Sequence, residues 1–382
     1  MEKKMAIGHL PSLTWNRLRM NEAAVDPEWL RMTAKAAVKV SCAEPAVYQD
    51  ITAKQAAEYL EKYAGVQEPE KYIAGKAPVY HAQRFATGLG AEFQKAMEQE
   101  NVPVHLLTVP AGTRPAENIR IDCHFPGNEN SGEQLLIHIR ENASATVLLN
   151  ETSEGDCRGS AAFMMRILME PGAKLTLARI QLLGYNMVSM NDLGVSQREN
   201  SELVCIPVEL GGSENYVGSA VELMEEGAAL KVLNGYMGTG SQKLDMNYNI
   251  VQRGRKTSCH MSFDGVLEDM AAKCFKGTID FRNGSSGSVG DEIENVLLLG
   301  EKAANRTLPV ILCEEEDVEG AHGATIGRLD ESILFYMASR GIDEKEAARI
   351  MIRARLEAVS REIPDEVLRK QISEYIERKI SC

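Results

Sequence analysis

The chain has 382 residues, of which 44% are hydrophobic and 25% are charged, a composition typical of a soluble globular protein. Its 42 lysines and arginines against 55 aspartates and glutamates give a formal net charge of −13, which argues against a broad surface for nucleic acid or an anionic membrane. No run of 18 apolar residues occurs, so no membrane-spanning helix is predicted, and the first residues lead into no apolar segment of a secretory signal.

Eight cysteines are scattered along the chain without a Cys-x-x-Cys pair. Their spacing excludes a zinc ribbon and a self-contained ferredoxin-type motif. Few, scattered thiols in a long chain are typical of a reduced protein rather than a disulfide scaffold, so we expect a cytoplasmic location.

Residues 1–100 have the composition of a mainly helical region. The segments 27–30, 53–63 and 91–100 have compositions that favour helix. Prolines at positions 11, 45, 69 and 78 interrupt the region, so we do not expect a single compact bundle.

Residues 101–325 are predicted to be mostly strand. Short apolar runs such as 135–139 and 175–183 alternate with turn signals such as Pro171-Gly172. From about residue 215 the strands start roughly 14 residues apart. A sandwich, a barrel or a solenoid can hold so many short strands, and the regular spacing favours a mainly β fold built as a solenoid, in which each coil stacks on its neighbours.

Residues 326–382 are predicted to be helical. The helix Asp330–Arg340 ends at Gly341, Asp343 can cap a second helix, and Pro364 opens a third. The expected apolar stripes are Ile350, Met351, Ala354 and Ala358 in the second helix, and Leu368, Ile372, Ile376 and Ile380 in the third. Such stripes must be buried on the end of the solenoid or on a partner.

Common catalytic motifs are absent, including the phosphate-binding Gly-x-x-x-x-Gly-Lys-Ser/Thr loop and the Gly-x-Ser-x-Gly elbow. His138 shares a strand face with Leu136 and Arg140, and we interpret it as a histidine facing solvent or a coil edge. The acidic run 314–319 could bind calcium or act as an acid–base pair on a polysaccharide. A solvated charge run is the simpler interpretation.

Five soft metal ligands fall within a span of 64 residues: Cys259, His260, Cys274, Cys313 and His322. Successive coils of a solenoid could bring such side chains together, and thiolate and imidazole ligands suit iron–sulfur clusters or other transition metals. Each cysteine taken singly also fits a small buried hydrophobic residue. The spacing leaves both interpretations open.

One stretch resembles a family signature. The residues 317–330, Asp-Val-Glu-Gly-Ala-His-Gly-Ala-Thr-Ile-Gly-Arg-Leu-Asp, with the following segment 334–342, resemble the SufB/SufD family of iron–sulfur cluster assembly scaffolds. The segments 295–300 and Leu10–Leu18 are similar to that family as well. Glu294 stands where SufB-type chains carry a cysteine, so the resemblance is closer to SufD.

The resemblance implies a fold and a role. The fold is a right-handed parallel β-helix with helical segments at both ends. The role is that of a non-catalytic scaffold subunit that pairs with a SufB-type scaffold and a SufC-type ATPase and receives sulfur indirectly from a desulfurase system. The chain alone is expected to hold no tightly bound cofactor, whereas the complex can hold a transient iron–sulfur cluster. Any contact with FADH₂ is left open.

The resemblance also implies site residues. In SufD-type members the histidine at the position of His322 is implicated at the interface with SufB, either as an iron ligand or as a structural histidine. Cys259, Cys274 and Cys313 match no ligand position of the family. The segment departs from the family at Gly320-Ala321, where a cysteine is common.

The C-terminal segment is implied to dock the ATPase. Tyr336 and Arg340 are four residues apart on one helix and offer residue types enriched at interface hot spots. The alternative is that Tyr336 packs inward and Arg340 bonds a helix C-terminus.

Two other functions are left open. One is a SufB-like scaffold that forms a homodimer and works with the ATPase alone. The other is a β-helix enzyme that acts on a polysaccharide through the carboxylates of 314–319, for which calcium or glycan binding by the isolated chain is expected.

Overall fold

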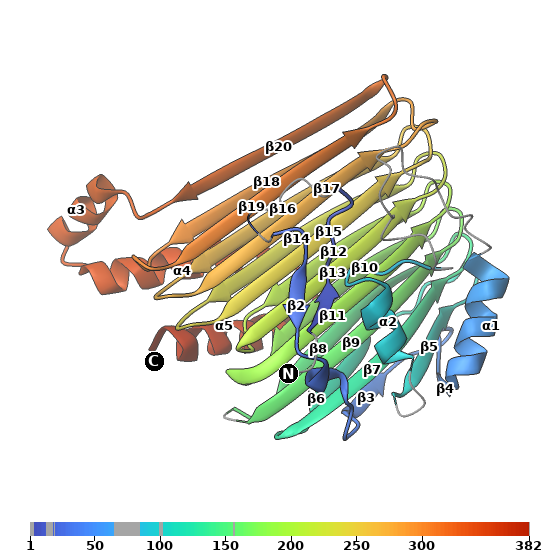
Figure 1. The fold of residues 1–382 in the computed structure, drawn as a ribbon, viewed down its shortest axis with the longest axis horizontal. Helices are drawn as coiled ribbons and strands as arrows, with labels where there is room; N and C mark the ends of the chain where they lie inside the picture. The colour runs from blue at the N-terminus through green and yellow to red at the C-terminus, as the bar shows by residue number, and fades with distance from the viewer. Residues whose placement is uncertain are drawn as a thin grey trace.

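A parallel β-solenoid forms the centre of the molecule (Figure 1). The computed structural model describes residues 4–12, 18, 20–64, 85–98, 102–155 and 157–381. In this part of the chain the strands alternate between two nine-stranded sheets, which we call the even sheet, ordered β20-β18-β16-β14-β12-β10-β8-β6-β3, and the odd sheet, ordered β19-β17-β15-β13-β11-β9-β7-β5-β4. The predicted mainly β solenoid is confirmed.

Each coil from β5–β6 to β19–β20 contributes one strand to each sheet. The even strands are β3 (Ala37–Ser41), β6 (Ile119–Phe125), β8 (Ser144–Ser153), β10 (Lys174–Leu182), β12 (Glu202–Glu209), β14 (Ala229–Gly238), β16 (Ser258–Leu267), β18 (Ser288–Leu298) and β20 (Val318–Gly327). The odd strands are β4 (Val47–Ile51), β5 (Val104–Val109), β7 (Glu129–Ile139), β9 (Arg158–Met169), β11 (Asn186–Gln197), β13 (Glu214–Leu223), β15 (Lys243–Gln252), β17 (Ala272–Phe281) and β19 (Ala304–Cys313).

The register repeats from coil to coil. Leu177 of β10 pairs with Cys205 of β12, 28 residues later, which is twice the strand interval seen in the sequence. Side chains alternate between the interior and the outside, so every second residue joins one continuous core between the two sheets, including Leu177 and Phe263. Because neighbouring coils share this alternation, residues in register face the same side.

The turns from odd to even strands share one backbone feature. Each of these turns except the last, between β19 and β20, contains a residue with positive φ: Gly112, Asn142, Gly172, Asn200, Gly227, Lys256 or Gly287. The amide of each of these residues donates to a carbonyl of the next coil, as Asn142 does to Pro171 at 2.9 Å. A Cβ at Gly172 would lie 2.3 Å from Oδ1 of Asn142, so the stacked turns alternate a side chain with a glycine at this point.

The first hundred residues are mixed. The helices predicted at 53–63 and 91–100 are present as α1 (Ala53–Ala64) and α2 (Ala91–Met97). The helix-favouring segment 27–30 forms the 3-10 helix η2 (Pro27–Leu30). The region also contains the antiparallel pair β1 (Met5–Ile7) and β2 (Ala23–Val25) and the strands β3 and β4, which were not predicted from the sequence. Residues 1–3, 13–17, 19, 65–84, 99–101, 156 and 382 lie outside the described residues, and with them part of the Leu10–Leu18 resemblance, Pro69, Pro78 and Cys382.

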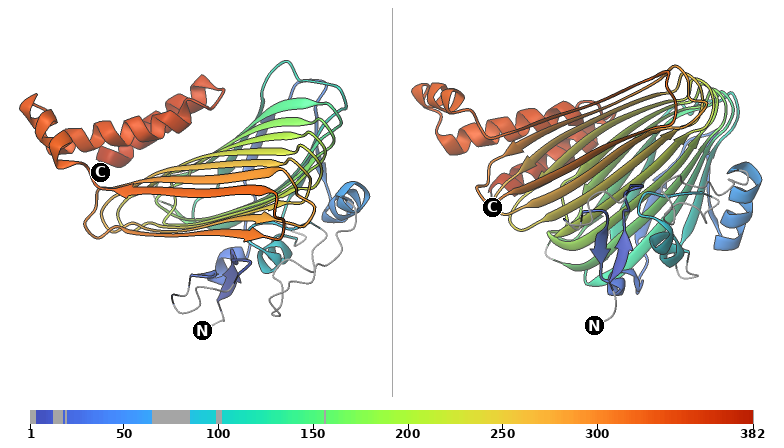
Figure 2. Two further views of the ribbon diagram at one scale, coloured as in Figure 1. Left: turned by 90° about the horizontal axis from the view of Figure 1, so that it is seen from above. Right: turned by 45° about the horizontal axis from the view of Figure 1, so that its top comes forward.

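Helices cover the two outer faces of the solenoid (Figure 2). α4 (Glu344–Ser360) and α5 (Glu366–Ser381) pack on the even sheet, whereas α2, β1 and β2 pack on the odd sheet. α5 buries the predicted residues Leu368, Ile372 and Ile376. The stripe predicted for α4 is wrong: the buried residues are Ala347, Ile352, Leu356 and Val359, whereas Ile350 is exposed.

Polar side chains fasten α5 to the even sheet. Tyr375 donates to the carbonyl of Leu183 at 2.6 Å. The ammonium of Lys379 donates to the carbonyls of Leu210 and Met237. These three carbonyls lie at the carboxyl ends of β10, β12 and β14, so one helix contacts three neighbouring coils. No described helix is long and apolar enough to cross a membrane.

Candidate functional site

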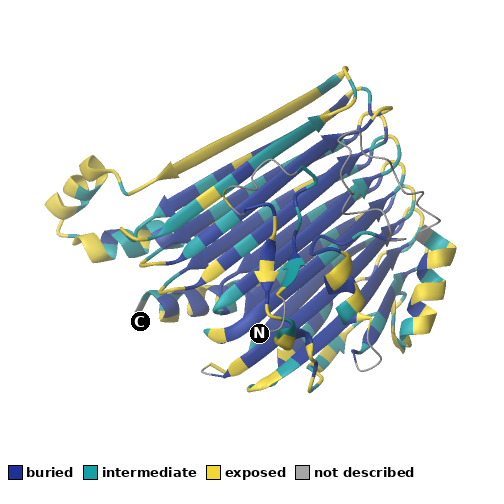
Figure 3. Ribbon diagram, in the orientation of Figure 1, coloured by how far each residue is buried: buried dark blue, intermediate teal, exposed yellow. Residues whose placement is uncertain are grey.

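The last coil leaves one end of the solenoid open. Among the described residues β20 and β19 are the outermost strands of their sheets. β20 is exposed from its second residue to its last, whereas β18 beside it is largely buried (Figure 3). An outermost strand carries a row of backbone N–H and C=O groups that can pair with another strand. This end therefore offers an edge to a partner, and we call it the open end.

His322 lies in the middle of β20. It pairs in register with Glu292 of β18, which pairs in turn with Met261 of β16. Met261 belongs to the interior core, so the imidazole stands on the interior side of the strand. His322 is nevertheless exposed because no further coil covers it. Its imidazole makes no hydrogen bond or ion pair with another described residue.

A fully buried ion pair lies beneath the last coil. The ammonium of Lys273 in β17 contacts the carboxylate of Glu294 in β18, and both side chains are 0% exposed. Thr307 donates to Glu294 at 2.6 Å, Tyr236 donates to it at 3.3 Å, and Lys273 also donates to Thr307 at 3.2 Å. Burial lowers the pKa of Lys273, and the charge of Glu294 opposes this shift. The charges of Lys273 and Glu294 are thus balanced by each other and by the hydrogen bonds around them.

Glu292 is the second carboxylate at the open end. Its side chain points into the solenoid, and the residue is 3% exposed. Burial raises the pKa of Glu292 to about 7, the neighbouring charge of Glu294 adds to the shift, and Lys273 opposes it. Gly277 makes room for this carboxylate, since a Cβ there would lie 1.9 Å from its Oε2.

The structure does not bring the three predicted cysteine ligands together with His322. Cys259 belongs to the interior core, where burial raises its pKa. Cys274 lies on the outer face of β17 against Leu10, and burial raises its pKa to about 11. Cys313 is exposed at the end of β19. Within the described ranges no three His, Cys, Asp or Glu side chains are grouped to hold a metal ion.

His138 corrects one interpretation from the sequence. It shares a face with Leu136 as predicted, but it is 1% exposed rather than facing solvent. α1 covers it, and Tyr59 of that helix contacts its Nδ1 at 2.6 Å while Glu170 contacts its Nε2 at 3.0 Å. Burial lowers the pKa of His138 to about 4. A strand pattern alone does not show which helix will cover its outer face.

The acidic run 314–319 mainly bonds the preceding turn. Glu314 pairs with Arg282 at 3.3 Å, Glu315 accepts from the amide of Gly284 at 3.0 Å, and Asp317 accepts from Ser286 at 2.7 Å. These carboxylates are distributed along the turn and hold one coil to the next. The run therefore gives little support to a polysaccharide site.

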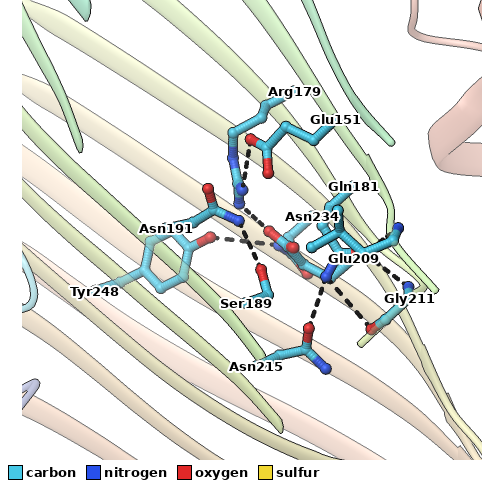
Figure 4. Close-up of polar contacts among 11 residues, drawn as sticks. Glu151, Arg179, Gln181, Ser189, Asn191, Glu209, Gly211, Asn215, Asn234 and Tyr248 are labelled. Carbon is cyan, nitrogen blue, oxygen red and sulfur yellow. Dashed lines mark hydrogen bonds and ion pairs between the residues drawn. The ribbon is translucent and has the colours of Figure 1, made fainter. Parts of the chain in front are cut away.

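A polar network inside the solenoid was not predicted. Arg179 of β10 lies between Glu151 of β8 and Glu209 of β12, both of which are 1% exposed (Figure 4). Burial raises the pKa of Glu151 to about 7 although Arg179 opposes the shift. A cavity of about 40 Å³ adjoins the network and is lined in part by Cys205 and Tyr248. The sequence signal for this network is the spacing of its charged residues, which lie about one coil apart at positions that face the interior.

α3 (Glu331–Ser339) projects away from the solenoid (Figure 2). None of its residues is buried, and Phe335 is 78% exposed. Tyr336 is exposed rather than packed inward, and the guanidinium of Arg340 lies 5.4 Å from its ring centre. The predicted cap of the next helix is present, because Asp343 accepts from the amide of Glu346 at 2.8 Å. α3 thus presents an apolar and aromatic face that the described residues do not cover.

Together these features define a β-solenoid with one bare end and a projecting helix, and comparison with known proteins agrees. Residues 125–355 match the family model described as SUF system FeS cluster assembly, SufBD core domain. The chain therefore belongs to the SufBD family. The matching relatives named below place it closer to SufD, as Glu294 in the position of the SufB-type cysteine predicts.

Two relatives are named iron–sulfur cluster assembly protein SufD. The relative from Bacillus subtilis is 26% identical over 248 residues, which cover 64% of this chain and 57% of the relative. The relative from Escherichia coli is 25% identical over 284 residues, which cover 72% and 66%. The chain thus spans less than two thirds of the length of these relatives.

Proposed function

We propose that this chain is a non-catalytic scaffold subunit of a SUF-type iron–sulfur assembly complex in the cytoplasm. It pairs with a SufB-type scaffold through the open end and binds a SufC-type ATPase through residues 326–382. The observation that carries the proposal is the bare last coil, which presents His322 on an exposed strand of a SufBD-family solenoid.

The edge of β20 supports pairing with a second scaffold chain. A partner strand laid along this edge would satisfy its free backbone groups and cover His322. β19 completes the interface, and its Pro309 suits an edge position because proline donates no hydrogen bond. A second copy of the same chain could occupy the same edge, which is the homodimeric alternative.

The exposed face of α3 supports ATPase docking. α4 and α5 use their apolar residues against the even sheet, so they are anchored to the solenoid. Ile333, Phe335 and Tyr336 of α3 are exposed and form the apolar part of a docking surface, to which Arg340 adds a positive charge. Aromatic residues and arginine dominate the binding energy of many interfaces.

The proposed mechanism requires that the ATPase dimer bind one arrangement of the two scaffold subunits more tightly than another. ATP binding would bring two ATPase subunits together, and their movement would shift the anchored helices of the two scaffolds. The interface between the scaffolds would then open and expose His322 for cluster assembly. A neutral imidazole can ligate iron through one ring nitrogen. His322→Ala is therefore expected to assemble normally but to mature clusters poorly.

Co-purification tests the proposal. The tagged chain is expressed with SufB-type and SufC-type partners, with and without residues 330–382. Because this truncation also uncovers the even sheet, the sharper variant is the double change Ile333→Ser and Phe335→Ser, which leaves α4 and α5 in place. Loss of the ATPase with retention of the SufB-type chain is the expected result. Failure of the intact chain to bind either partner would overturn the proposal, and a stable self-dimer would favour the homodimer.

A further inference from the structure

Two short strands cap the end of the solenoid that lies opposite the open end. β3 pairs antiparallel with β6, and β4 pairs antiparallel with β5, so among the described residues each is the outermost strand of its sheet. We call β3 and β4 the cap strands. A cleft of about 710 Å³ lies beside them and is lined by both cap strands and the start of β5. Because each cap strand is short and pairs on one side, side-chain bonds to the solenoid contribute much of its attachment.

His105 lies at the centre of a charged cluster that holds the cap strands. Nδ1 of His105 in β5 contacts Oδ1 of Asp50 in β4 at 2.7 Å, and its Nε2 contacts Oε2 of Glu133 in β7 at 3.1 Å. The other carboxylate oxygen of Glu133 accepts from the amide of Ala36, directly before β3, at 3.1 Å. The ring of Tyr48 in β4 stacks on the imidazole with the ring centres 5.3 Å apart. One histidine and two carboxylates thus link both cap strands to the first coils.

The geometry of this cluster fixes the protonation of the imidazole. A neutral imidazole has one N–H and donates one hydrogen bond, whereas an ionised carboxylate can only accept. Both ring nitrogens of His105 lie within hydrogen-bond distance of a carboxylate oxygen, so both bonds form only when the ring carries two protons and a positive charge. Burial lowers the pKa of His105, but the hydrogen bonds to Glu133 and Asp50 outweigh burial and raise the pKa above its ordinary value of 6.5.

The other titratable groups at this end do not replace the histidine. Lys35 lines the same cleft but is exposed, and it forms no ion pair with another described residue. Cys123 faces the interior from β6, and burial raises the pKa of its thiol, as it does for the phenol of Tyr48, so both are uncharged. α1 packs on the opposite face of β5, against Leu106. The imidazolium of His105 is therefore the cation that joins the two carboxylates.

The two carboxylates differ in what the loss of a proton from His105 costs them. The side chain of Glu133 is 1% exposed, whereas that of Asp50 is 86% exposed. A buried carboxylate without a donor is costly, whereas an exposed carboxylate can bond to water. A neutral imidazole therefore keeps its remaining N–H toward Glu133 and gives up the bond to Asp50.

We propose that His105 is a pH-sensitive latch for the cap: as the pH rises, the imidazole releases Asp50 and β4 loosens, while Glu133 continues to hold the start of β3. The attachment of β4 is strongest below pH 6.5, where the histidine would be protonated even in the unfolded chain. It is lost as the pH rises through the raised pKa of the folded state, because the folded protein then gives up the extra proton. The latch is independent of the proposed function, since it needs no partner.

Hydrogen exchange of the full chain at about pH 6 and about pH 8.5 tests the latch. Each exchange rate is divided by the rate of an unstructured amide at the same pH, which leaves the protection of the strand itself. The protection of β4 is expected to fall at least about threefold between the two pH values, the scale of a partly exposed ion pair. The protection of β3 should change less, because Glu133 keeps its bond to the amide of Ala36.

His105→Gln should abolish the pH dependence of β4, because the amide does not titrate in this range. The matched control is His124→Gln, which removes an exposed histidine from β6, beside the same cap, and should preserve the dependence. Circular dichroism checks that both variants are folded. Protection of β4 that is independent of pH in the wild type, or equally dependent on pH in His105→Gln, would overturn the latch.

A second measurement does not require the His105 variant to fold. Magnetic resonance of the chain with ¹³C at histidine Cε1 follows the protonation of each imidazole, and Asp50→Asn changes only an exposed side chain. His105 is expected to titrate above pH 6.5 in the wild type and at a lower pH in Asp50→Asn. Titration of His105 below pH 6.5 in the wild type, or at the same pH in Asp50→Asn, would refute the latch.

Discussion

Buried charges inside the solenoid are held by contacts between neighbouring coils. Arg179 is 11% exposed, and it joins two carboxylates from the coils on either side of it. Water cannot screen these charges, so removing one partner leaves the others uncompensated. The network therefore fixes three consecutive coils relative to one another.

Arg179→Met is expected to destabilise the protein by about 3–5 kcal/mol, because Glu151 and Glu209 would then face each other without a counter-charge. Urea unfolding measures the change. The control is Arg198→Met, which removes a 39% exposed guanidinium paired with Glu225 and should cost less than about 1 kcal/mol. Equal losses in the two variants would contradict the role of the interior network.

Lys379 predicts how stability depends on pH. Burial lowers the pKa of this amine to about 7, although Glu268 opposes the shift, whereas in the unfolded chain the pKa stays near 10.5. Between these values the unfolded state binds the extra proton, so stability rises with pH by up to about 1.4 kcal/mol per unit. Below pH 7 this residue adds no slope, because both states carry the proton.

Urea unfolding from pH 7 to pH 10 measures this contribution. Lys379→Met should flatten the rise, whereas Lys370→Met, which removes a 78% exposed amine of the same helix, should preserve it. An unchanged slope in Lys379→Met would show that the amine is not buried in solution.

At the scale of elements, α3 differs from every other helix near it because it is not anchored by buried residues. Phe335→Ser should leave the free energy of unfolding within about 0.5 kcal/mol of the wild type. The same change should weaken binding of the SufC-type ATPase at least tenfold, which is about 1.4 kcal/mol. Calorimetric titration with the purified ATPase measures this.

The comparison variant for α3 is Val367→Ser, which removes a 56% exposed apolar residue from α5. ATPase affinity should not change, since Val367 lies on the helix that packs on the solenoid. A similar loss in both variants would indicate a general effect of surface hydrophobicity rather than docking by α3.

The helices show what a sequence pattern can and cannot fix. The cap Asp343 and the buried row of α5 could be predicted, because caps and a single apolar row are local signals. The buried face of α4 could not, because its apolar residues surround more than one face and the even sheet selects Ile352 and Leu356. The sheet against which a helix packs decides which helix face is buried, and the apolar pattern of the helix alone does not reveal that face.

At the scale of the whole molecule, the solenoid was predictable because each coil contacts its neighbours at a fixed interval. β3 and β4 were not, since they are five residues long and pair antiparallel with the distant β6 and β5. The candidate site divides in the same way. His322 could be found from a family resemblance. Glu292 could not, because only the strand register places it next to His322, and Lys273 could not, because only the folded structure brings it to Glu294.

Stability is expected to be uneven along the solenoid. The last coil is bounded on one side only, so β20 should open locally more easily than β11, which pairs on both sides. In hydrogen exchange the amides of β20 should exchange at least about a hundredfold faster than those of β11. Adding the SufB-type partner should slow β20 and leave β3, at the opposite end, unchanged.

Equal protection of β20 and β11 in the isolated chain would mean that another group already covers the open end. If the partner slowed hydrogen exchange in β3 rather than in β20, the interface would lie at the opposite end of the solenoid, which would contradict pairing through the open end.

The attachment of α5 has a mechanical consequence. Tyr375 and Lys379 tie the helix to backbone carbonyls of Leu183, Leu210 and Met237, one at the end of each of three adjacent even strands. A force applied to the C-terminal helices is therefore shared among three strands instead of peeling one strand from the sheet. When the C-terminal helices move, the even sheet would therefore move with them as one rigid body.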